Sequence, residues 1–74
     1  MPVTIKLFAG FQKDRFAVDV REVAPGTRVR DVVEALSIEA SEVGVTIVNG
    51  RHVELDDGLR PDDVLAVFPV IGGG

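Results

Sequence analysis

The stretch Val29-Arg30-Asp31-Val32-Val33-Glu34-Ala35-Leu36 decides the fold that this sequence predicts. Its apolar residues have the i, i+3, i+4, i+7 spacing of one helix face: Val29, Val32, Val33 and Leu36. Because β-branched valines lower helix propensity, packing against a sheet has to hold this helix in place. We predict a helix over residues 28–36, with Thr27 as the N-cap residue whose hydroxyl accepts a bond from an early amide.

The residues before the helix predict two paired strands. Large apolar side chains occupy every second position in residues 3–8 and again in residues 16–21, which is the period of a β-strand. The polar residues 10–15 form only a short connection, so the two strands are expected to make an antiparallel hairpin. Pro25-Gly26 ends the second strand.

The residues after the helix predict a loop followed by two more strands. Residues 37–44 read as the loop, and residues 45–48 as a strand that ends at the strong turn signal Asn49-Gly50. Residues 52–54 are expected to pair beside it as a short edge strand. Leu59 is expected to enter the core from a loop.

Residues 64–68 read as the last strand. Alternation predicts that Leu65 and Val67 face the helix and that Ala66 and Phe68 lie on the other face. A single helix laid on one sheet face buries both apolar surfaces, so we predict an α+β fold. The expected architecture is a mixed sheet of four to five strands packed on one main helix, formed by residues 1–69.

Composition limits the functions that the chain is expected to have. The 74 residues suffice for one small domain, and the absence of cysteine removes disulfides, thiolate nucleophiles and cysteine-ligated metal sites. The net charge is −4 and the basic residues are scattered, so we expect no nucleic-acid partner. No apolar stretch approaches the roughly 20 residues of a membrane span, and no signal-peptide pattern opens the chain. We therefore expect a cytoplasmic protein without a membrane partner.

The sequence ends in Phe68-Pro69-Val70-Ile71-Gly72-Gly73-Gly74. Glycines have no side chain to pack and the greatest backbone freedom, so residues 70–74 are predicted to be a flexible C-terminal glycine tail. The structural interpretation is a frayed end that does nothing. The functional interpretation is a narrow extended segment that carries the carboxylate of Gly74 into the active site of another protein.

The order of these elements, together with the ending, resembles the β-grasp fold of ubiquitin-like proteins. Within that fold the chain most resembles the MoaD/ThiS family of sulfur carriers, and in particular MoaD-like proteins, the small subunits of molybdopterin synthase. Five segments carry the resemblance. They are similar to the family's "LFA", "V-x-D-L-L", "VNG", "L-x-x-G-D" and "F-P-P-V-x-G-G" patterns: Lys6-Leu7-Phe8-Ala9, Val29-Arg30-Asp31-Val32-Val33, Val48-Asn49-Gly50, Leu59-Arg60-Pro61-Asp62-Asp63 and residues 68–74.

Four positions depart from the family pattern. Arg28 stands at the usual capping Ser/Thr position, which is why Thr27 would cap one residue early. Asp62 replaces a glycine, and aspartate tolerates the left-handed backbone that such a glycine adopts. Val70 replaces the second proline and should leave the tail less stiff, while Gly72 is an added glycine.

The resemblance implies a protein co-substrate rather than an enzyme. A partner adenylating enzyme would use ATP and magnesium to adenylate the Gly74 carboxylate, while Gly72 and Gly73 thread the tail into its site. A sulfur donor would then produce a thiocarboxylate, which gives its sulfur to a sulfur-accepting synthase subunit, with molybdopterin biosynthesis as the expected pathway. No cofactor or metal is expected to be bound. Two alternatives stay open: a ubiquitin-like modifier conjugated through Gly74, and a non-covalent interaction module with an inert tail.

The partner-binding surface is expected to include Phe8, Phe68, Pro69, Val70 and Ile71. Phe8 and Phe68 both fall on the predicted outer sheet face beside the tail. Scattered exposed apolar residues are normal on proteins, so the competing interpretation is that these two phenylalanines mean nothing. Two aromatic side chains on one face next to a functional tail instead favour a docking surface.

Two polar clusters resemble functional sites, but a structural interpretation explains each of them better. His52 lies near Glu54, Asp56 and Asp57 in the sequence, but one histidine among loop acids is more often solvated than a metal ligand. Asp62-Asp63 looks like a carboxylate pair, yet no nucleophile or pocket accompanies it, so a turn after Pro61 explains it better.

Overall fold

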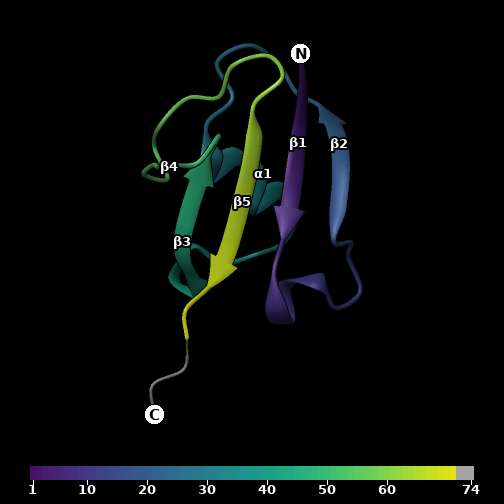
Figure 1. Cartoon of the computed structure of the whole chain (residues 1–74), viewed down its shortest axis with the longest axis vertical. Helices are drawn as coiled ribbons and strands as arrows, with labels where there is room; N and C mark the ends of the chain where they lie inside the picture. Colours follow the sequence, from purple (N-terminus) through teal and green to yellow (C-terminus); the bar gives the residue numbers. More distant parts are fainter. Residues whose placement is uncertain (72–74) are drawn as a thin grey trace.

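A single five-stranded sheet forms the body of the molecule (Figure 1). The computed structural model describes residues 1–71. In chain order its elements are β1 (Pro2–Leu7), the 3-10 helix η1 (Ala9–Gln12), β2 (Val18–Glu22), α1 (Val29–Ala35), the 3-10 helix η2 (Ala40–Glu42), β3 (Val43–Val48), β4 (Arg51–His52) and β5 (Val64–Pro69). The strand order is β2-β1-β5-β3-β4, and α1 lies behind the sheet in the view of Figure 1.

The pairing makes the sheet mixed, as the sequence predicts. β1 pairs antiparallel with β2, which confirms the hairpin, and parallel with β5. β3 pairs antiparallel with both β5 and β4. Because β1 and β5 are parallel neighbours, their C-terminal ends lie side by side at the same end of the sheet. This brings the residues just after β1 beside the last residues of β5.

The core lies between the sheet and α1. Eleven apolar side chains are buried in it: Val3, Ile5, Leu7, Phe11, Val29, Val32, Val33, Ile38, Leu59, Leu65 and Val67. Three of the four residues in the predicted helix stripe are among them, and the fourth, Leu36, packs against the cluster while half-buried. Leu59 reaches the core from a loop, and Leu65 and Val67 are fully buried on the helix side, as predicted.

The predicted N-cap is wrong by one residue. Arg28 is the N-cap of α1, and its backbone N–H donates to Asp31 Oδ2 at 2.9 Å. The Thr27 hydroxyl is engaged in the turn before the helix, where it donates to the Ala24 carbonyl at 2.6 Å. Thr27 therefore closes the Pro25-Gly26 turn, in which Gly26 has a φ of 91°.

Loop carbonyls satisfy the first amides of α1. The Val29 N–H donates to the Asp57 carbonyl at 3.0 Å, and the Arg30 N–H donates to the Leu55 carbonyl at 2.7 Å. Arg30 Nε also lies 2.8 Å from Asp56 Oδ1. This hydrogen bond, reinforced by charge attraction, lowers the pKa of Asp56 and raises that of Arg30. Both groups face solvent, so the pair contributes little to stability.

β1 and β5 shift by one residue from their predicted limits, and the larger differences concern β2, β3 and β4. β2 begins at Val18 rather than Phe16, because Phe16 packs toward the core while Val18 is exposed on the outer face. β3 begins two residues early, at Val43, because a bulge lets residues 43–45 stay paired with β5. β4 covers only Arg51–His52, because the Val53 carbonyl accepts a bond from the Thr46 hydroxyl at 2.7 Å.

A side-chain bridge ties the Asn49-Gly50 turn to the start of β5. Asn49 Oδ1 accepts from the Val64 N–H at 2.9 Å, and Asn49 Nδ2 donates to Asp63 Oδ1 at 2.9 Å. Asp63 is buried, and its other oxygen accepts from the Arg60 N–H at 2.8 Å. Asp62 has a φ of 68°. The interpretation of Asp62-Asp63 as a turn is therefore confirmed.

Asn49→Gly is expected to lower the free energy of unfolding by about 1–3 kcal/mol, because it leaves the buried Asp63 carboxylate without one donor. Asn49 has a φ of 52°, which glycine adopts freely, so the substitution removes the side-chain bonds without straining the turn. Urea unfolding measures the change. Asp14→Gly is the control, since Asp14 has a φ of 58° and its side chain makes no hydrogen bond to the rest of residues 1–71. Equal losses in the two variants would show that the bridge contributes nothing.

Candidate functional site

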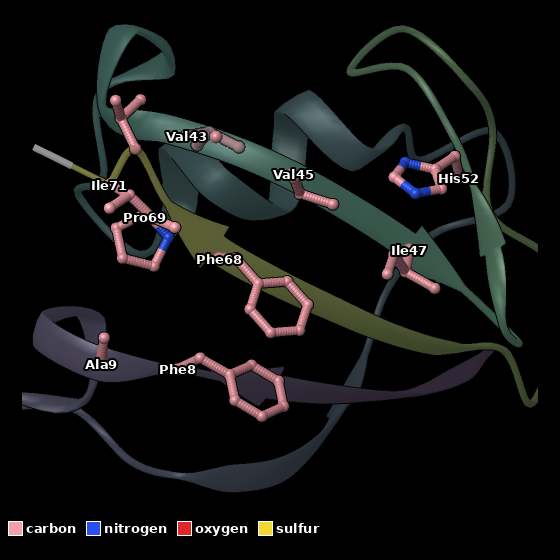
Figure 2. A pocket seen from close by; sticks show the side chains of 11 residues that line it. Phe8, Ala9, Val43, Val45, Ile47, His52, Phe68, Pro69 and Ile71 are labelled. Carbon is pink, nitrogen blue, oxygen red and sulfur yellow. The ribbon is translucent and has the colours of Figure 1, made fainter. Parts of the chain in front are cut away.

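An apolar groove crosses the outer face of the sheet near the end of β5 (Figure 2). β3, β4 and β5, with the segments that follow β1 and β5, supply its walls. Eleven residues line it: Phe8, Ala9, Val43, Gly44, Val45, Ile47, His52, Phe68, Pro69, Val70 and Ile71. All five residues that the sequence assigns to partner binding are among them.

Strand alternation places the side chains of this groove. In β5 the buried Leu65 and Val67 face α1, so Ala66 and Phe68 face outward, as predicted. The register pairs Phe68 with Val45, and Ala66 with Ile47, which puts the β3 side chains on the same face. Ile47 pairs in turn with His52 of β4, so the groove extends toward that edge of the sheet.

Phe8 and Phe68 form the aromatic part of the groove. Their ring centroids are 4.2 Å apart and the ring planes differ by 12°, so the rings are stacked (Figure 2). Phe8 follows β1 directly in an extended conformation, and Ala9 then turns the chain away with a φ of 51°. Each ring is half-buried, which leaves part of the stack open to a partner. The sequence predicts the shared face, but the contact depends on the parallel pairing of β1 with β5.

Exposed apolar side chains continue from the groove along the end of the chain. Val70 is 54% exposed and Ile71 is 91% exposed. The Val70 N–H donates to the Glu42 carbonyl at 2.9 Å, so the chain stays attached to η2 one residue beyond β5. The predictions for Gly72, Gly73 and Gly74 lie outside the described residues, and the proposed limit between domain and tail stays a prediction.

The polar clusters do not form a second site in the part of the chain that the structure covers. Within residues 1–71 no three His, Cys, Asp or Glu side chains come together in a way that could hold a metal ion. Asp57 Oδ2 accepts from the Glu54 N–H at 2.7 Å, and Asp56 pairs with Arg30, so these acids organise their own loop. His52 is exposed at the groove rim.

No helix within residues 1–71 is long and apolar enough to span a bilayer. The expectation that the protein acts in the cytoplasm stays a prediction.

A mixed five-stranded sheet packed on one helix, with an apolar groove beside the last strand, defines a protein of the ubiquitin-like β-grasp class. The ThiS family model matches residues 5–74, and the chain belongs to the ThiS family. Proteins of this kind are small sulfur carriers and non-catalytic subunits, so the chain acts as a carrier rather than as an enzyme.

Three solved structures share the fold. A protein from Pyrococcus furiosus, proposed to be subunit 1 of molybdopterin converting factor, is 30% identical with a TM-score of 0.77, over 96% of this chain and 99% of that one. SAMP1 from Haloferax volcanii is 24% identical with a TM-score of 0.77, over the whole of both chains. A chain from the complex of subunits 1 and 2 of molybdopterin-converting factor from Helicobacter pylori is 18% identical with a TM-score of 0.66, again over both whole chains. The last two likenesses concern the fold alone.

Proposed function

We propose that this protein carries sulfur as a thiocarboxylate on Gly74 and delivers it in molybdopterin biosynthesis. The observation that carries the proposal is the continuity of the apolar groove with residues 69–71, which lead directly into Gly72-Gly73-Gly74. A partner that docks on the groove is thereby placed beside the end of the chain. The 30% identity to the Pyrococcus furiosus protein supports this pathway over others that use a ThiS-family carrier.

The chemistry requires a partner because the chain cannot activate its own carboxylate. A carboxylate is a poor electrophile until one of its oxygens becomes part of a good leaving group. An adenylating enzyme would supply ATP and Mg²⁺ and join the Gly74 carboxylate to AMP, with release of pyrophosphate. A donor of sulfide-level sulfur would then supply HS⁻, which attacks the carbonyl carbon and expels AMP, leaving the thiocarboxylate. The sequence contains no cysteine that could intervene as a nucleophile.

The tail sequence suits delivery into a recessed site. Glycine has no β-carbon, so Gly72, Gly73 and Gly74 would fit a channel that excludes side chains. Six residues follow Phe68 and end with Gly74, and an extended chain of that length spans up to about 20 Å. The docked groove and the reactive end can therefore act at separate places on one partner.

The groove is expected to dock two partners in turn, first the adenylating enzyme and then the sulfur-accepting synthase subunit. Aromatic side chains are enriched among the residues that dominate binding energy, which favours the Phe8–Phe68 stack as the anchor. The net charge of −4 would favour partners with a basic rim around their apolar surface. The complex of subunits 1 and 2 from Helicobacter pylori supports a pairing of the second kind.

A ubiquitin-like modifier is the second candidate function. SAMP1 is a small archaeal modifier protein, and its fold matches this chain over its whole length. In that case the activated Gly74 would form an amide bond with a lysine of another protein. A non-covalent module with an inert tail is the third candidate.

Intact mass spectrometry of the protein from its native host tests the proposal. We expect a fraction of the chain with one oxygen replaced by sulfur, in a form that a thiol-reactive alkylating reagent labels at Gly74. Labelling is required because oxidation of Met1 adds almost the same mass. A chain linked through Gly74 to lysines would favour the modifier. Unmodified chain alone, with no phenotype when residues 72–74 are deleted, would favour the inert tail. Loss of molybdopterin rather than thiamine in a deletion strain would identify the pathway.

A further inference from the structure

Gly44 is the extra residue of a β-bulge where β3 meets the end of β5. The register pairs Val43 with Pro69 and Val45 with Phe68, so two steps along β3 oppose one step along β5. A bulge bends its strand and increases the local twist, and it is often found where a segment has to be aimed. Here the opposing segment is the one that leads out of the sheet to the C-terminus (Figure 1).

The backbone of β5 passes Gly44 too closely for any side chain. A β-carbon built on Gly44 would lie 2.7 Å from the Pro69 carbonyl oxygen, 2.9 Å from the Pro69 carbonyl carbon and 3.0 Å from the Val70 α-carbon. All three are backbone atoms, so rotating a side chain cannot relieve the contact. Gly44 has no positive φ, unlike Gly26 and Gly50. The glycine is therefore needed for close approach and not for an unusual backbone conformation.

A hydrogen bond holds the same point of the chain against the residue that precedes β3. The Val70 N–H donates to the Glu42 carbonyl at 2.9 Å, directly before the bulge. Pro69 has a restricted φ and no N–H of its own. The exit direction of the chain is thus set by Gly44, the Glu42–Val70 bond and Pro69 together.

We propose that Gly44 is a positioning residue that aims the C-terminal tail. A larger residue would push Pro69 and Val70 away from β3 and redirect the chain that ends in Gly74. The inference rests on the proposed function, because redirection matters only if the Gly74 carboxylate reacts in a partner's site. A misplacement of about 1 Å in such a site can slow the reaction on the order of a hundredfold.

The test compares Gly44→Ala with the unmodified full chain as co-substrates for the cognate adenylating enzyme. ATP–pyrophosphate exchange is measured over a range of co-substrate concentrations, at a temperature where thermal unfolding shows each variant to be folded. We expect kcat to fall about tenfold or more while KM changes less than about threefold, because the Phe8–Phe68 stack still anchors docking while placement of the carboxylate is lost. An unchanged kcat for folded Gly44→Ala would overturn the inference.

Gly58→Ala is the matched control. A β-carbon on Gly58 meets no other atom within 4 Å, its φ is not positive, and it lies outside the groove. It should leave both kinetic parameters unchanged. If Gly44→Ala does not fold, a chain with an ester in place of the Pro69–Val70 amide takes its place, because it removes the Val70 donor and adds no atom to β3. That chain should also lose kcat, and unchanged kinetics would count against the inference.

Residual dipolar couplings of the free protein separate this inference from the proposed function. The Val70 and Ile71 amide couplings should change in Gly44→Ala, while those of α1 stay as they are. Unchanged couplings would overturn the inference whether or not any partner reacts. An unmodified chain that no adenylating enzyme of the host accepts would instead refute the proposed function.

Discussion

A chain that ends at Gly73 is expected to support ATP–pyrophosphate exchange at about one hundredth of the full-length rate or less. The attacking carboxylate oxygen has to lie within about 3–3.5 Å of the α-phosphorus for adenylation to proceed. Removing Gly74 leaves a glycine carboxylate that is chemically equivalent but about 3.3–3.6 Å short. The docked groove fixes how far the chain reaches, so the shorter chain cannot make up this distance.

Deleting Gly74 should not change the stability of the fold. The buried apolar core runs from Val3 to Val67, and Val70 is already outside it. The chain ending at Gly73 should therefore unfold at the same urea concentration as the full chain. This separates a loss of reactivity from a loss of structure.

Three chain lengths decide the register of the reactive end: the full chain, the chain ending at Gly73, and a chain with one residue added after Gly74. Only the first should react well with the cognate adenylating enzyme. If the chain ending at Gly73 reacts as well as the full chain or better, Gly74 is an extra residue that has to be trimmed before activation. If none of the three reacts with any adenylating enzyme of the host, the sulfur-carrier proposal fails and the interaction module takes its place.

The parts of the fold that follow local rules could be predicted from the sequence. The helix stripe and the alternation in β5 each reflect one period, and each period shows directly which side chains are buried. That is why the sequence alone places Leu65 and Val67 in the core and Phe68 on the outer face. Asn49-Gly50 and Asp62 could be predicted because left-handed turns favour few residue types.

The parts that depend on contacts distant in the sequence could not be predicted. The N-cap could not be predicted because the Thr27 side chain belongs to its own turn, where it donates to the Ala24 carbonyl. The bond from Asn49 to Asp63 spans 14 residues and becomes apparent only when the turn meets β5.

The candidate site likewise has a part that the sequence predicts and a part that depends on contacts distant in the sequence. Alternation places Phe8 and Phe68 on one face, but their stacking at 4.2 Å requires the parallel register of β1 and β5. Nothing near Gly44 in the sequence marks it as different from other loop glycines. Its role appears only because Pro69 and Val70 pass against it.

Phe68→Ala is expected to weaken binding to the adenylating enzyme about thirtyfold, which corresponds to roughly 2 kcal/mol for a residue that anchors an interface. The half-buried Phe68 ring lies at the centre of the groove and stacks on the Phe8 ring. Its removal therefore takes away the anchor and its stacking contact with Phe8. The fold should lose less, about 1–2 kcal/mol, because Phe68 points away from the core. Calorimetric titration gives the affinity and urea unfolding gives the stability.

Two control substitutions test whether the loss of binding is specific to the groove. Leu65→Ala removes a fully buried side chain from the other face of β5 and should cost about 2–5 kcal/mol of stability, while the molecules that stay folded bind normally. Val20→Ala removes a side chain that is 59% exposed on the outer sheet face but outside the groove, and it should change neither quantity much. If Phe68→Ala behaves like Leu65→Ala, with normal affinity and a large loss of stability, Phe68 belongs to the core. If Val20→Ala weakens binding as much as Phe68→Ala, the partner covers the whole outer face, and the groove is not the site that it selects.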